Sequence, residues 1–139
     1  MQILFEVCRT NANPASAGAD IDVLKGNAII LEVHSEHVTE VFTGIGRRGI
    51  PAEHVAEEAL NEMREYLEAG VPVGYHLADQ LMLPLGIAAW QTGQGGRFRT
   101  LPLTLHSTTH MDILRTFLNC QITSEIDGNG TIVSICPPE

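Results

Sequence analysis

The sequence contains few basic residues. It has 8 Lys and Arg residues and 17 Asp and Glu residues, which gives a formal net charge of −9 at pH 7. Affinity for a nucleic acid backbone comes mainly from Lys and Arg that displace counterions. The tightest basic pair is Arg47-Arg48. We therefore expect any nucleic acid contact to be local, at a chain end or a single nucleotide, and not to involve a broad basic face.

Cysteines and long apolar runs are also scarce. The three cysteines, Cys8, Cys120 and Cys136, have no CxxC or CxxH spacing, which is typical of reduced thiols rather than of a disulfide framework or a zinc site. The start MQILFEVCRT lacks the features of a signal peptide. The longest apolar stretch, 81–90, has about half the length that spans a bilayer. We predict a soluble, cytoplasmic protein with no membrane partner.

Enough apolar residues are present for one real core, since 44% of the 139 residues are hydrophobic. Periodicity and turn residues predict the following elements: strands over 1–8, 28–33, 38–45, 98–103, 120–126 and 131–136, and helices over 51–69, 77–89 and 108–118. Strands 28–33 and 38–45 should form an antiparallel pair, and the turn DGNG (127–130) predicts a hairpin. The fold class is α+β, with a mixed or antiparallel sheet and helices packed on one face.

Helical spacing also predicts which side chains face the core. We expect these residues to point inward: Val55, Ala59, Met63, Leu67, Leu77, Leu81, Leu83, Leu85, Ile113, Leu114 and Phe117. Residues 1–26, a strand followed by an Asn-, Ala-, Gly- and Pro-rich loop, look like the end of a missing or inserted domain. Residues 27–139 would then form one α+β domain.

Two pairs of histidines could be metal ligands. His34 and His37 lie in EVHSEHV beside Glu32 and Glu36, but His34 and Glu36 face one side of a strand and His37 the other, which favours a solvated strand end over a metal site. His106 and His110 are four residues apart and would share one face of a helix. If the helix starts near Thr108, however, His106 lies at the junction before it as a structural residue. We predict no metal site.

Two segments together resemble the C-terminal part of RNA 3'-terminal phosphate cyclases. GYHLADQLMLPLGIA (74–88) is similar to the family's Gly-x-Tyr-Leu-Ala-Asp-Gln-Leu-x-Leu-Pro run, and FRTLPLTLHSTTHMDILRTFL (98–118) to its strand, histidine and helix. Weaker similarity covers most of the rest from residue 27 onward. The resemblance implies a cyclase-type repeat unit within an incomplete enzyme.

The family uses ATP to convert an RNA 3'-phosphate into a 2',3'-cyclic phosphate through a histidine-AMP intermediate. The resemblance implies that His106 is the nucleophile and that His76, Leu77, Ala78, Asp79 and Gln80 line the nucleotide site, with ATP and a divalent cation, Mg or Mn, as cofactors. By default Asp79 and Gln80 would only satisfy helix N–H groups. His stands at 76 where the family usually has Tyr, so either His76 or the adjacent Tyr75 could stack on adenine.

The family enzyme is much longer than this chain. The resemblance implies that the RNA 3'-phosphate end is a partner of the complete enzyme, with the phosphate-binding arginines on a missing N-terminal portion or a companion chain. Self-association into a homo-oligomer is the alternative. We expect this chain alone to be inactive with ATP. The alternative function is a non-catalytic, cyclase-like binding module in RNA processing or ribosome biogenesis, although such relatives lack the histidine.

Overall fold

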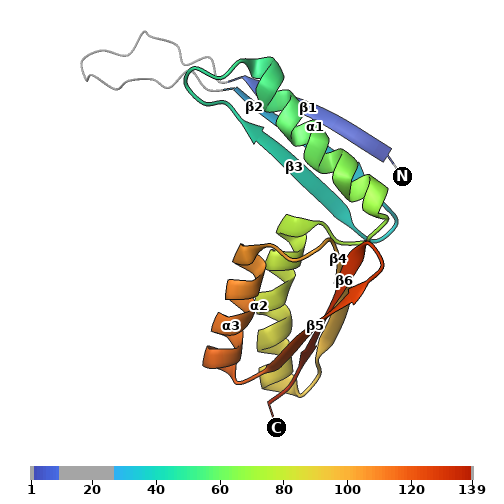
Figure 1. Cartoon of the computed structure of the whole chain (residues 1–139), viewed down its shortest axis with the longest axis vertical. Helices are drawn as coiled ribbons and strands as arrows, with labels where there is room; N and C mark the ends of the chain where they lie inside the picture. The colour runs from blue at the N-terminus through green and yellow to red at the C-terminus, as the bar shows by residue number, and fades with distance from the viewer. Residues whose placement is uncertain (1, 10–26, 139) are drawn as a thin grey trace, which may run out of the picture. The chain divides into compact units, whose positions relative to one another are not determined.

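The computed structural model describes residues 2–9 and 27–138 of the chain (Figure 1). The segment 10–26, for which we predicted a loop, lies outside the described residues. The chain divides into two compact units, Met1–Glu65 and Tyr66–Glu139. The division predicted at residue 26 stays a prediction, because it falls at the edge of that undescribed segment.

The first unit is built on a three-stranded antiparallel sheet with the order β1-β2-β3. Its strands are β1 (Gln2–Arg9), β2 (Asn27–His34) and β3 (Thr39–Ile45). The register pairs Ala28 with Ile45. Alternate residues of β3 are buried, as expected for a strand with one face covered. The antiparallel pair predicted from the sequence is confirmed.

Helix α1 (Ala52–Ala69) supplies the apolar stripe of this unit. Val55, Ala59 and Met63 are buried, as the helical spacing predicts. Gly44 lets the start of the helix approach β3, since a Cβ at Gly44 would lie 2.6 Å from the carbonyl oxygen of Val55. The helix ends before Gly70, whose φ of +60° suits a residue without a side chain.

The second unit has a three-stranded antiparallel sheet with the order β4-β6-β5, covered on one face by two helices (Figure 1). Its elements are β4 (Gly96–Thr100), β5 (Gln121–Asp127), β6 (Gly130–Cys136), α2 (Tyr75–Thr92) and α3 (Leu105–Leu118). The predicted hairpin is confirmed, with Gly128 at φ +58° in its turn. The predicted α+β class is confirmed. Among the described residues, none of the helices is long and apolar enough to cross a membrane.

The buried face of α2 differs from the one predicted. Small and flexible residues form it: Ala78, Met82, Gly86 and Ala89. Leu83 is exposed, so its predicted place in the core was wrong. The physical reason is close packing between helices, because a Cβ at Gly86 would already lie 3.1 Å from Leu118 Cδ1 of α3. The larger Leu77, Leu81 and Leu85 flank this contact and are half-buried.

Helix α3 begins three residues earlier than predicted. Thr104 caps it: its hydroxyl oxygen accepts a hydrogen bond from the backbone N–H of Ser107 at 3.2 Å. The side of α3 that packs in the core carries its buried residues, Ser107, Met111 and Leu114. Ile113 and Phe117, predicted to face inward, are exposed because the core packs against the face that carries Met111 and Leu114, and that prediction was wrong for both.

Cys120 lies in the core that joins α2, α3 and the sheet. Its thiol donates to the carbonyl oxygen of Gly86 at 3.4 Å. Burial raises the pKa of the Cys120 thiol above its ordinary value. Since the thiolate is the nucleophilic form, this cysteine is a packing residue rather than a reactive one.

Candidate functional site

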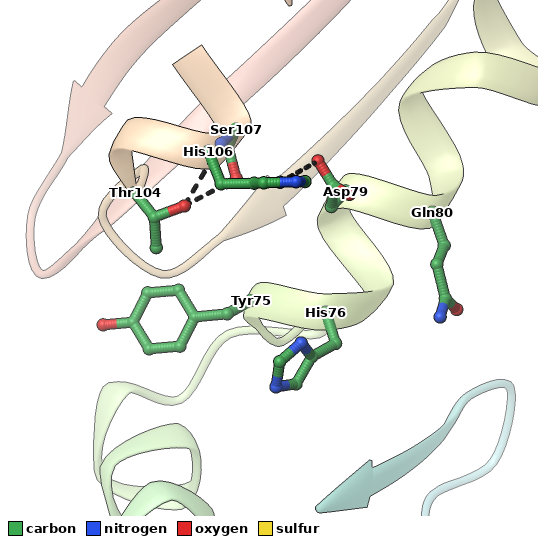
Figure 2. A pocket seen from close by; sticks show the side chains of 7 residues that line it. All are labelled: Tyr75, His76, Asp79, Gln80, Thr104, His106 and Ser107. Atoms are coloured by element: carbon green, nitrogen blue, oxygen red, sulfur yellow. Dashed lines mark hydrogen bonds and ion pairs between the residues drawn. The ribbon is translucent and has the colours of Figure 1, made fainter. Parts of the chain in front are cut away.

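The candidate site is a cavity of about 350 Å³ between the first turns of α2 and α3 (Figure 2). Three kinds of group line it: aromatic or imidazole rings, hydroxyls, and one acid–amide pair. The lining residues are Tyr75, His76, Asp79, Gln80, Thr104, His106 and Ser107. Its size lies at the lower end of the range for small-molecule pockets.

Two helix N-termini meet at this cavity. Gly74 is the N-cap of α2 and has no side-chain cap, while Thr104 is the N-cap of α3. Each helix start carries a partial positive charge and directs backbone N–H groups outward. The two helix starts favour an anionic group in the cavity, whereas the Asp79 carboxylate opposes one, and none of the described residues lining it is Lys or Arg.

Asp79 links α2 to α3 by accepting hydrogen bonds from two histidines. Its Oδ1 lies 3.1 Å from Nδ1 of His106 and 2.9 Å from Nδ1 of His110. The two histidines are one helical turn apart on α3, so their rings share a face. Figure 2 shows the His106 ring directed at the Asp79 carboxylate.

This contact determines the chemistry available to His106. An ionised carboxylate only accepts hydrogen bonds, so the neutral imidazole must carry its proton on Nδ1 to bond it. The other ring nitrogen, Nε2, then holds a free lone pair. The His106 side chain is 80% exposed, so a ligand in the cavity can reach Nε2. The arrangement suits a nucleophile oriented by a carboxylate.

The structure brings together only part of the residue set that the resemblance implied. His76, Asp79, Gln80 and His106 line the cavity. Leu77 and Ala78 are not among the lining residues; Ala78 is buried in the core and Leu77 is half-buried. Tyr75 and His76 both line the cavity, so each could contact a base (Figure 2).

The described residues do not provide a protein-held metal site. Asp79 is the one carboxylate of the lining, and its Oδ1 is already shared by two imidazoles. Within residues 2–9 and 27–138, no three His, Cys, Asp or Glu residues are grouped so that they could hold a metal ion. The divalent cation that the resemblance implied for the complete enzyme therefore stays a prediction, and we derive no step through a cation.

The histidines and the arginine that the sequence left as possible metal ligands or phosphate contacts lie close to other side chains of the chain. His34 bonds Glu32 through Nε2 at 3.0 Å and Thr39 through Nδ1 at 2.9 Å. His37 lies 3.6 Å from Glu36 and is exposed. Arg99, which the sequence left as a possible phosphate contact, donates to the Asp127 carboxylate at 2.8 Å and thereby anchors the β5–β6 hairpin.

Sequence reasoning missed three contributors to the site: His110, Thr104 and Ser107. The spacing of the polar residues and histidines in 104–110 contained a usable signal. Thr104 followed three residues later by Ser107 is a usable cap, and a helix start at 105 puts His106 and His110 on one face. The predicted helix start near Thr108 left His106 outside the helix, so His106 and His110 were not expected to share a face.

Comparison with known proteins gives two kinds of match. Residues 3–68 match the family model described as "RNA 3'-terminal phosphate cyclase (RTC), insert domain". That stretch nearly coincides with the first compact unit. Proteins named RNA 3'-terminal phosphate cyclase are similar over most of the chain. The one from Ectopseudomonas mendocina is 40% identical over 103 residues, which is 74% of this chain and 29% of the relative.

Two further relatives with the same name agree. The Ralstonia nicotianae protein is 38% identical over 79% of this chain and 30% of its own length. The Koribacter versatilis protein is 43% identical over 67% of this chain and 25% of its own length. The chain thus spans less than a third of the curated relatives it matches. The chain belongs to the RNA 3'-terminal phosphate cyclase family.

Proposed function

We propose that the second unit carries the nucleophile and part of the nucleotide site of an ATP-dependent RNA 3'-terminal phosphate cyclase. The complete enzyme would convert an RNA 3'-phosphate into a 2',3'-cyclic phosphate through AMP attached to His106. The observation that supports this best is the 3.1 Å contact between Asp79 Oδ1 and His106 Nδ1, at a cavity where two helix starts favour an anion.

The first step is nucleophilic attack by His106. The lone pair on Nε2 attacks the α-phosphorus of ATP, a P–N bond forms, and the bond to the bridging oxygen breaks so that pyrophosphate leaves. Nε2 carries no proton at the start, so no separate base is required. Asp79 stabilises the positive charge that develops on the ring, because it accepts the Nδ1 proton in a hydrogen bond.

The second half transfers the AMP. An oxygen of the RNA 3'-phosphate attacks the phosphorus of AMP, the P–N bond breaks, and its electron pair returns to Nε2 of His106. The oxygen of the neighbouring 2'-hydroxyl then attacks the activated 3'-phosphorus, the P–O bond to AMP breaks so that AMP leaves, and the hydroxyl proton passes to solvent. The product is the 2',3'-cyclic phosphate, and the imidazole is restored.

The remaining lining residues fit the nucleotide. Tyr75 and His76 offer flat rings for stacking on a base, and Gln80 offers both a donor and an acceptor. The backbone N–H groups at the starts of α2 and α3 suit phosphate oxygens. Because the described lining carries no Lys or Arg, the triphosphate needs positive charge from elsewhere in the complete enzyme. We therefore expect the isolated chain to take no AMP from ATP.

The proposed function can be tested by a chimera. In the Ectopseudomonas mendocina relative, the stretch that aligns with this chain is replaced by the residues of this chain, and the ATP-dependent cyclisation of an RNA 3'-phosphate is measured. We expect the chimera to cyclise the RNA and His106→Ala to abolish the reaction, because His106 is the lining histidine whose Nδ1 is held by Asp79 so that Nε2 can attack.

A matched control separates the nucleophile from a general effect of losing a histidine. His37→Ala, at an exposed position in the first unit, should leave cyclisation unchanged. If the His106→Ala chimera melts normally and still cyclises RNA, the assignment is wrong. A folded chimera that binds ATP but forms no cyclic phosphate would instead favour the non-catalytic binding module.

A further inference from the structure

We propose that His110 is a positioning residue that holds the Asp79 carboxylate in the orientation required by His106. The inference rests on the proposed function of His106 for its catalytic meaning, but the geometry it describes can be measured separately. His110 lies one turn after His106 on α3, and its Nδ1 lies 2.9 Å from the same Oδ1 that accepts from His106.

The two histidines differ in how firmly they are held. The side chain of His110 is 21% exposed, whereas that of His106 is 80% exposed. An exposed side chain loses more conformational freedom when it is fixed, so a contact between His106 and a mobile carboxylate would be weak. The half-buried His110 is fixed first by its surroundings. It can therefore hold Asp79 in place before His106 binds.

One carboxylate oxygen can serve both rings, because it has two lone pairs. His110 must then donate from Nδ1, as His106 does. Its bond fixes the rotation of the Asp79 side chain and presents Oδ1 to α3. Without this bond the carboxylate could turn toward solvent, since Asp79 is itself 26% exposed. His106 would then lose the partner that keeps its proton on Nδ1.

The backbone around His110 supports this role. Its neighbour Met111 is buried in the core of the second unit, which fixes the rotation of α3 about its axis. The hydroxyl of Thr109, the residue directly before His110, donates to the Leu105 carbonyl oxygen one turn earlier at 2.8 Å. The position from which His110 reaches Asp79 is therefore set by the fold and does not depend on a ligand.

Two substitutions of similar shape separate donation from packing. In asparagine the amide nitrogen is bonded to Cγ, as Nδ1 is in histidine, so His110→Asn keeps a donor close to the same place. In leucine a methyl group occupies that place, so His110→Leu keeps the bulk and removes the donor. Both variants should fold, because the side chain is not fully buried.

The direct test is the tautomer of His106 in the isolated chain, read from the ¹⁵N chemical shifts of its ring at about pH 8, where imidazoles are neutral. We expect the wild type and His110→Asn to carry the proton on Nδ1. In His110→Leu we expect a shift toward the Nε2-protonated form. An unchanged His106 tautomer in a folded His110→Leu variant would overturn the proposal.

The rate of AMP attachment to His106 tests whether this positioning affects its reactivity. Adenosine 5'-phosphorimidazolide donates AMP to an imidazole without a triphosphate, since the leaving group is imidazole. We expect His110→Leu to slow AMP attachment to His106 about fivefold and His110→Asn to restore most of the rate. Equal rates in both variants would contradict the positioning role. If the tautomer depends on residue 110 while His106 accepts no AMP, the positioning stands and the proposed nucleophile fails.

Discussion

Replacing Asp79 with alanine is expected to slow AMP attachment to His106 about thirtyfold, which corresponds to about 2 kcal/mol for a lost charge-assisted hydrogen bond. The donor is adenosine 5'-phosphorimidazolide and the rate is followed by mass spectrometry of the peptide that contains His106. The physical reason is the 3.1 Å bond to Nδ1. Without it the ring can carry its proton on Nε2, and the lone pair then faces away from the attack direction.

The matched control removes a carboxylate from α3 instead. Asp112 pairs with Arg115 at 2.6 Å and is not among the cavity residues. Asp112→Ala should therefore leave the rate at His106 within about twofold, because long-range effects of exposed charges are screened by salt. If Asp79→Ala and Asp112→Ala have the same effect, Asp79 contributes only general negative charge and does not orient the nucleophile.

Replacing Met111 with alanine is expected to reduce the free energy of unfolding by about 3 kcal/mol, within the range for large-to-small core substitutions. Met111 is 2% exposed and packs in the core cluster with Met82 and Leu114. The loss combines buried apolar surface with a cavity that the neighbours only partly fill. Unfolding in urea can be followed by the fluorescence of Trp90, the one tryptophan of the chain.

Ile113→Ala is the control on the same helix. Ile113 is 49% exposed, so we expect its truncation to cost less than about 1 kcal/mol. The comparison also tests the corrected orientation of α3, because the sequence had predicted Ile113 to face inward. Equal destabilisation by the two substitutions would mean that α3 is rotated from the described position, and the histidine pair would then no longer face Asp79.

The parts of the fold predicted correctly are those with strong local signals. The turn DGNG determines the β5–β6 hairpin, and Gly70 with Pro72 marks the end of α1. The start of α3 was missed because Thr104, Ser107, Thr108 and Thr109 can all cap a helix. Local sequence does not choose between them. In the structure the helix begins at Leu105, which places Ser107 on the same buried face as Met111 and Leu114.

The candidate site was likewise predicted only in part. His106, Asp79, Gln80 and His76 were identified through the resemblance, and the structure places all of them at one cavity. His110 was weighed only as a metal ligand. Its contact with Asp79 depends on the angle between α2 and α3, which the spacing within either helix does not contain. Leu77 and Ala78 belong to the same run but lie away from the cavity.

We expect His106 to owe its reactivity to its contact with Asp79 and not to its exposure. The most direct measurement is the rate of AMP transfer from adenosine 5'-phosphorimidazolide to each histidine of the wild-type chain. His37 is the internal reference, because its side chain is 83% exposed and that of His106 is 80% exposed. We expect His106 to react at least about tenfold faster than His37. Equal rates at His106 and His37 would contradict the account.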